Sequence, residues 1–179
     1  GRRKMAISPA EAEADVIYQI GALKAFCDAV GVPLHHVKPH GALYNMAAKD
    51  PALAAAICRA VKAATPEAML LALSGSEMIK AAQALGLRVC SEVFADRGYQ
   101  PDGTLVPRGK PGAMIESEDE AIARVLQMAK QGTVCAVDGS TVALRADSVC
   151  VHGDGPKALA FVRKISAALP AAGVEIKAQ

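Results

Sequence analysis

The sequence predicts an α/β fold in which short buried strands alternate with helices. Apolar runs of strand length recur between amphipathic segments of ten or more residues, and polar, titratable residues follow the ends of those runs. Strands that are separated by helices need crossover connections, so they lie parallel with their helices outside. Two architectures satisfy this pattern equally well, a β/α barrel and an open doubly wound sheet.

Five runs have the length and composition of buried strands. They are residues 32–37, 68–73, 87–93, 133–137 and 148–152. In α/β folds, ligands bind beyond the carboxyl ends of parallel strands, where the loops converge and helix amino termini point. We therefore expect the functional residues on the rim formed by these five ends.

Residues that are typical of helix starts and helix ends predict helices between these runs. Two Ser-x-x-Glu capping boxes and one Asp-Pro pair are typical of helix starts, and glycines are typical of helix ends. The signals are Ser8 with Glu11, Asp50 with Pro51, Ser117 with Glu120, and the glycines Gly31, Gly86 and Gly132.

Composition indicates one soluble domain that covers residues 1–179. The 179 residues are 52% hydrophobic without a long apolar run or a secretory signal, so the core is ample and no membrane association is expected. A net charge of +2 with interspersed signs gives no reason to expect nucleic acid as a partner. Five cysteines without a CxxC pair favour a reducing cytoplasm.

The first two strand ends carry candidate site residues. Lys38, His40, Tyr44 and Asn45 follow the first run, where a cation and an imidazole flank a proline, and Ser74 follows the second run in a helix start with exposed hydroxyls. The alternative is that Lys38 and His40 fix a turn, and that Tyr44 and Asn45 hold its shape. Alternation also places His35 and His36 on opposite faces, which leaves at most one facing inward.

The later strand ends add a second group of candidates. Glu92 lies in the third run, and a long loop with Asp96 and Arg97 follows it. The loop extends to residue 112 and is expected to fold back as a flap with a tight turn at Asp102-Gly103. An ion pair between Asp96 and Arg97 that braces this flap is the structural alternative. His152 and Asp154 follow the last run, where Asp154 also has the chemistry of a helix cap.

Three segments resemble the LamB/YcsF family, the A subunit of bacterial 5-oxoprolinase. They are HVKPHGALYN at residues 36–45, EVFADR at 92–97 with LVPR at 105–108, and VCVHGD at 149–154. The resemblance implies a distorted β/α barrel related to the carbohydrate deacetylases, and an ATP-dependent opening of 5-oxo-L-proline to L-glutamate. It also implies partner subunits B and C. The family's amino-terminal motifs have no counterpart here, so the barrel is expected to lack its first strands.

The implied reaction assigns roles to the candidate residues. A lactam is a poor electrophile, so its opening needs a metal-activated water or phosphorylation of the amide oxygen, and the family's use of ATP, with Mg, favours the second route. A lysine or arginine then holds negative charge, and an imidazole or carboxylate activates water. The predicted catalytic residues are Lys38, His40, Glu92, Asp96 and His152, and the predicted substrate-binding residues are Tyr44, Asn45, Ser74, Arg97 and Asp154.

Two other functions fit the same residues. A metal-dependent deacetylase or amidohydrolase would use His40, His152 and an acid around a divalent ion, although no closely spaced Cys/His cluster predicts a metal site. A non-catalytic scaffold subunit would use the rim for binding alone. No Walker-type phosphate loop occurs in the sequence, so ATP handling is expected to involve the partner subunits or a cradle without that motif.

Overall fold

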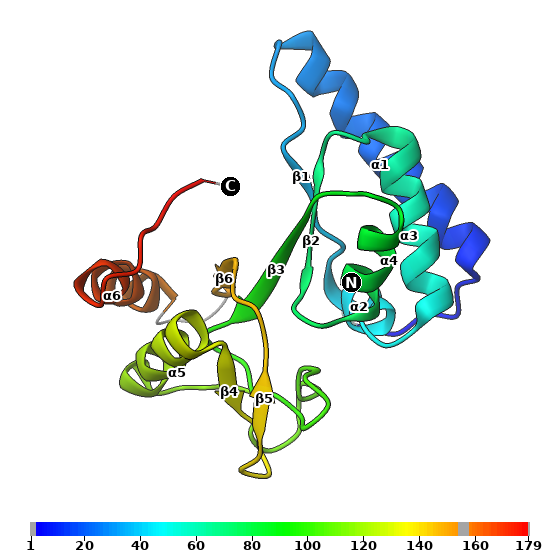
Figure 1. The fold of residues 1–179 in the computed structure, drawn as a ribbon. Helices are drawn as coiled ribbons and strands as arrows, with labels where there is room; N and C mark the ends of the chain where they lie inside the picture. Colours follow the sequence, from blue (N-terminus) through cyan, green and yellow to red (C-terminus); the bar gives the residue numbers. More distant parts are fainter. Residues whose placement is uncertain (1–2, 154–157, 179) are drawn as a thin grey trace. The chain divides into compact units, whose positions relative to one another are not determined.

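The computed structural model describes residues 3–153 and 158–178 as two compact units, Gly1–Cys90 and Ser91–Gln179 (Figure 1). Strand β3 (Val89–Phe94) begins in the first unit and continues in the second. Each unit contains parallel strand pairing together with helices. The predicted α/β fold is therefore confirmed.

The first unit combines helices with the parallel strands β1 and β2. Its elements are α1 (Pro9–Ala29), β1 (His36–Val37), α2 (Gly41–Ala47), α3 (Pro51–Ala64), β2 (Met69–Leu73) and α4 (Glu77–Ala84). His36 of β1 pairs with Met69 of β2. Helix α3 packs against both α1 and α4, and its apolar face, which includes Leu53, Ile57 and Val61, is buried.

The predicted helix starts form as expected in the first unit. The Ser8 hydroxyl accepts a hydrogen bond from the Glu11 backbone N–H at 3.2 Å, and the Glu11 carboxylate accepts one from the Ser8 backbone N–H at 2.8 Å. This reciprocal pair is the predicted capping box of α1. At α3, the Asp50 carboxylate accepts from the backbone N–H groups of Ala52 and Leu53.

The Asp50 cap makes a measurable contribution to stability. We expect Asp50→Ala to lower the free energy of unfolding by about 1 kcal/mol, because two N–H groups at the start of α3 lose their acceptor. Asp50→Asn keeps a side-chain oxygen at this position and should cost much less. Urea denaturation of the two variants beside the wild type measures the difference, and equal stability of all three would contradict the prediction.

The first predicted strand is shorter than expected. The sequence favours residues 32–37, but β1 contains only His36 and Val37, and α2 begins four residues later at Gly41. Pro33 lacks a backbone N–H and Val32 is largely exposed, so the start of the run has neither the donor nor the burial that a strand needs. Helix α2 was not predicted.

The second unit is built around the parallel pair β3 and β6. Its further elements are α5 (Glu118–Gln131), β4 (Thr133–Cys135), β5 (Thr141–Ala143), β6 (Ser148–Cys150) and α6 (Ala158–Ala171). Glu92 pairs with Ser148, and Phe94 pairs with Cys150. Helix α5, which Ser117 caps through the Glu120 N–H, packs against α6. This register brings the residues that follow β3 and β6 to the same edge.

The fourth predicted strand does not join the parallel sheet. Strand β4 pairs antiparallel with β5, with Thr133 opposite Ala143, in a separate two-stranded sheet. The turn between them is closed by the Asp138 carboxylate, which accepts from the Ser140 backbone N–H at 3.0 Å. The connection is too short for a crossover, so only a hairpin is possible. The parallel assignment of residues 133–137 was wrong.

The long loop after β3 folds back on itself as predicted. Antiparallel bridges join Tyr99 to Leu105 and Arg97 to Met114. The tight turn includes Gly103, whose backbone N–H donates to the Gln100 carbonyl at 2.9 Å. The hairpin form of the flap is therefore confirmed, with its arms held by single bridges rather than by regular strands.

Candidate functional site

Lys38 and His40 lie where β1 ends and α2 begins, in the position that the sequence predicts. His40 is the residue before the first turn of α2, but its side chain forms no capping hydrogen bond. The Lys38 ammonium lies 5.7 Å from the ring centroid of Tyr44, which is buried. This distance is typical of a cation–π contact. Tyr44 therefore helps to position Lys38.

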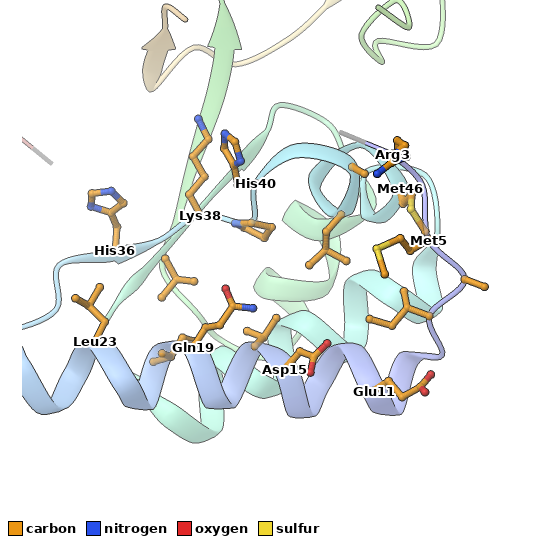
Figure 2. A pocket seen from close by; sticks show the side chains of 18 of the residues that line it. Arg3, Met5, Glu11, Asp15, Gln19, Leu23, His36, Lys38, His40 and Met46 are labelled. Carbon is orange, nitrogen blue, oxygen red and sulfur yellow. The ribbon is translucent and has the colours of Figure 1, made fainter. Parts of the chain in front are cut away.

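A cavity of about 770 Å³ adjoins Lys38 and His40 in the first unit (Figure 2). Three basic side chains from the β1 region line it, those of His36, Lys38 and His40. Helix α1 contributes the polar side chains of Glu11, Asp15 and Gln19, and apolar residues of α1 and α2 also line the cavity. The side lined by these basic residues can hold an anionic group such as a carboxylate or phosphate.

Two other candidates of the first unit serve the local structure. The Asn45 amide donates to the Gly41 carbonyl at 2.9 Å, one turn earlier in α2. Ser74 and Ser76 were expected to be exposed, but they are only 8% and 5% exposed. The Glu77 N–H donates to the Ala48 carbonyl, so the turn that contains both serines packs against the end of α2. The expectation of exposed hydroxyls here was wrong.

In the second unit, Asp96 and His152 form a close pair. The Nδ1 atom of His152 lies 2.8 Å and 3.0 Å from the two carboxylate oxygens of Asp96. The backbone N–H of His152 also donates to Asp96 Oδ2 at 3.1 Å. The Phe94 ring stacks on the imidazole, with centroids 5.7 Å apart and planes 23° apart. These contacts together fix the position of the imidazole.

The environment of Asp96 favours its ionised form. Burial alone would raise the pKa of Asp96, but the hydrogen bonds and the charge of His152 outweigh burial and lower that pKa below the ordinary value. A carboxyl group with a lowered pKa stabilises the folded protein above its unfolded pKa, about 3.9, and this contribution is lost as the pH falls through the folded pKa.

This linkage predicts an acid-dependent stability difference. The wild type should be more stable than Asp96→Asn at pH 6, and the difference in the free energy of unfolding should shrink between about pH 5 and 3. Urea denaturation of both proteins across this range measures it. A difference that stays constant down to pH 3 would show that the charge of Asp96 does not contribute.

Arg97 is buried in the flap and binds the loop backbone. Its Nε donates to the Ala113 carbonyl at 3.0 Å, and its Nη2 donates to the Val106 carbonyl at 2.6 Å. Among the described residues, Asp96 forms its ion pair with His152 rather than with Arg97, which the structural alternative had paired with it. The bracing role of Arg97 is supported, although through backbone carbonyls.

Glu92 is a buried carboxylate on the strand that leads to this pair. It lies two residues before Phe94 on β3, so both side chains project from the same face. Tyr99 is also buried and accepts a hydrogen bond from the Phe94 backbone N–H at 2.9 Å. Burial raises the pKa of Tyr99, and the charge of Glu92 raises it further. Asp154 lies outside the described residues.

The model of the LamB/YcsF family matches residues 1–179. The chain belongs to the LamB/YcsF family. It is similar to the 5-oxoprolinase A subunit of Clostridium beijerinckii, with 57% identity over 98% of this chain and 69% of the relative. It is 54% identical to the 5-oxoprolinase A subunit of Bacillus subtilis, over 99% of this chain and 69% of the relative.

A solved structure supports the same assignment for this LamB/YcsF chain. The lactam utilization protein from Thermus thermophilus is 50% identical to it and superposes with a TM-score of 0.89. The match covers 100% of this chain and 71% of that protein. Family membership and fold therefore agree.

Sequence reasoning missed some residues of the two candidate sites in this LamB/YcsF chain. Glu11, Asp15 and Gln19 line the cavity from α1, and their spacing of four residues, which places them on one helix face, was the available signal. Phe94 also went unnoticed as the residue that stacks on His152.

The described part of the LamB/YcsF chain contains neither a membrane-spanning helix nor a cluster of metal-binding side chains. Within residues 3–153 and 158–178, no helix is long and apolar enough to cross a membrane. Within the same ranges, no cluster of three or more His, Cys, Asp or Glu side chains has the arrangement to hold a metal ion.

Proposed function

We propose that this chain is the A subunit of an ATP-dependent 5-oxoprolinase, which opens the lactam ring of 5-oxo-L-proline to give L-glutamate. The observation that carries the proposal is the identity of 54–57% to relatives named as the A subunit of 5-oxoprolinase, over nearly the whole chain. The likeness to a lactam utilization protein supports the same substrate class.

The first unit offers a site for the anionic part of the reaction. ATP, bound with Mg and shared with partner subunits B and C, would supply a phosphoryl group that makes the lactam oxygen a leaving group. Lys38 and His40 would hold the substrate carboxylate or the phosphorylated oxygen, and the cation–π contact with Tyr44 would keep the ammonium in place. The basic wall of the cavity fits such a group.

The second unit offers the groups that handle protons. His152 is held by Asp96 and Phe94, so it is the better ordered of the two candidate imidazoles as a base for water. Glu92 would contribute a second buried carboxylate. Asp154, which lies outside the described residues, would contact the substrate. Arg97 would hold the loops of the second unit, and Asn45 and Ser74 would hold those of the first unit, in keeping with their contacts and burial.

The proposed assignment also has consequences for the domain architecture and the cellular compartment. We infer that residues 1–179 form a single domain of a distorted β/α barrel, and that the protein acts in the cytoplasm. The parallel pairs β1–β2 and β3–β6 suit such a barrel, because each places a strand end with site residues after it.

An add-back experiment tests the proposed function. Subunits B and C, incubated with ATP, Mg²⁺ and 5-oxo-L-proline, should release no glutamate on their own, and addition of this chain should start release. Glutamate is measured with glutamate dehydrogenase, and heat-denatured chain is the control. Release that is the same with and without the chain, or absent from the complete mixture, would contradict the proposal.

A further inference from the structure

We propose that Asp96 is a positioning residue that holds the proton of His152 on Nδ1, so that Nε2 of His152 is the atom that accepts a proton from the attacking water. The inference rests on the proposed function for the reaction that it serves. The pairing itself rests on the geometry of Asp96, His152 and Phe94 alone.

The contacts of Nδ1 decide which tautomer the neutral imidazole adopts. An ionised carboxylate only accepts hydrogen bonds, and both oxygens of Asp96 lie within 3.0 Å of Nδ1. Nδ1 must therefore carry the proton as the donor, which leaves a lone pair on Nε2. No hydrogen bond to Nε2 is formed within residues 3–153 and 158–178, so this lone pair is available to a water molecule.

The position of the pair is set by the sheet. Phe94 and Cys150 are opposite each other in the parallel pairing of β3 and β6, and Asp96 and His152 each lie two residues farther along. The Asp96 carbonyl also accepts from the Ile115 N–H at 3.0 Å, which ties this residue to the far arm of the flap. The backbone of Asp96 is therefore held by the strand pairing and by this hydrogen bond, independently of the contact between its carboxylate and the imidazole.

Exposure differs between the two members in the way that catalysis requires. The Asp96 side chain is 8% exposed, whereas the His152 side chain is 23% exposed. A shielded carboxylate keeps a strong hydrogen bond to Nδ1, and a partly accessible imidazole can meet water and substrate. A purely structural ion pair does not require an accessible imidazole, whereas a catalytic base does.

The proton transfer balances within the proposed reaction. Nε2 takes one proton from water as the water oxygen bonds to the lactam carbonyl carbon. The ring C–N bond then breaks, and the same proton passes from Nε2 to the departing nitrogen. The phosphoryl group that ATP supplied remains on the former lactam oxygen as an acyl phosphate, and a second water hydrolyses it to give phosphate and glutamate. Asp96 takes no proton, and its charge stabilises the imidazolium that exists between the two transfers.

The first test observes the tautomer directly. The ¹⁵N shifts of labelled histidine rings in the wild-type chain should show Nδ1 of His152 protonated and Nε2 unprotonated at a pH where the ring is neutral. His152→Gln assigns the signals among the four histidines. A proton on Nε2 would overturn the proposal whether or not the complex is active.

The second test uses kinetics in the reconstituted complex. Asp96→Asn should lower kcat for glutamate release by about 100-fold with little change in KM, because base catalysis is worth roughly 10²–10⁴. Asp138→Asn, the same change in an exposed turn of the same unit, should leave kcat within about twofold.

A double variant separates positioning from a purely structural role. If Asp96 acts through His152, adding Asp96→Asn to His152→Ala should lower kcat no further. A further fall of about 10-fold or more in the double variant, or a wild-type kcat in Asp96→Asn, would overturn the positioning role. An inactive wild-type complex would instead overturn the proposed function, while the tautomer measurement still decides the pairing.

Discussion

Replacing Lys38 with alanine should lower glutamate release by the reconstituted complex by about 100-fold or more. Lys38 is the cation that the Tyr44 ring holds at the end of β1, and removing one such group from developing negative charge costs roughly 10²–10³ in rate. The measurement is kcat for glutamate release at saturating ATP and 5-oxo-L-proline.

A second lysine-to-alanine variant controls for the loss of one positive charge, and gel filtration controls for assembly. Lys62→Ala removes an exposed lysine from the last turn of α3 and should keep wild-type activity. Both variants should form the complex with subunits B and C, which gel filtration checks. If Lys38→Ala assembles and keeps wild-type activity, the first unit serves as a scaffold and the chemistry lies elsewhere.

Gly98→Ala should be the most destabilising single substitution in the flap. A Cβ atom at this position would overlap the backbone carbonyl oxygen of Gly112, on the other arm of the hairpin. Because backbone atoms cannot rotate away as a side chain does, the two arms must separate. We expect a loss of about 3 kcal/mol or more in the free energy of unfolding, measured by urea denaturation.

Gly21→Ala is the control for adding a methyl group. Gly21 lies inside α1, and a Cβ atom at this position would have no other atom within 4 Å, so the alanine should stabilise the protein by up to about 1 kcal/mol. Unchanged stability of Gly98→Ala would mean that the hairpin arms are not in the close contact that the structure shows. Protection of flap amides in hydrogen exchange would locate any such change.

Local chemistry explains which parts of the fold were predictable. The Ser8 box and the Asp50 cap act within three residues, so the sequence identifies them directly. The predicted parallel pairing of β4 was wrong because the apolar pattern of this segment is the same in a parallel strand and in a hairpin arm. The short turn at Asp138, which follows β4, makes β5 its pairing partner. Likewise, the shortness of β1 depends on burial that periodicity does not reveal.

The candidate residues of the two units also differ in how far the sequence could predict them. Lys38 and His40 are near each other in sequence, so their strand-end position was sufficient to select them. Asp96 and His152 were each selected, but 56 residues separate them, and their pairing depends on the register of β3 and β6. The neighbour of Asp96 in sequence, Arg97, was the partner that the structural alternative proposed. It binds loop carbonyls because the flap folds over its guanidinium.

The coupling of glutamate release to ATP is the most direct measurement of the central claim. The complex of this chain with subunits B and C should release glutamate and ADP in equimolar amounts from 5-oxo-L-proline, and no glutamate without ATP. Glutamate release that continues without ATP and stops when a chelator removes divalent metal would contradict the claim. It would identify a metal-dependent amidohydrolase instead.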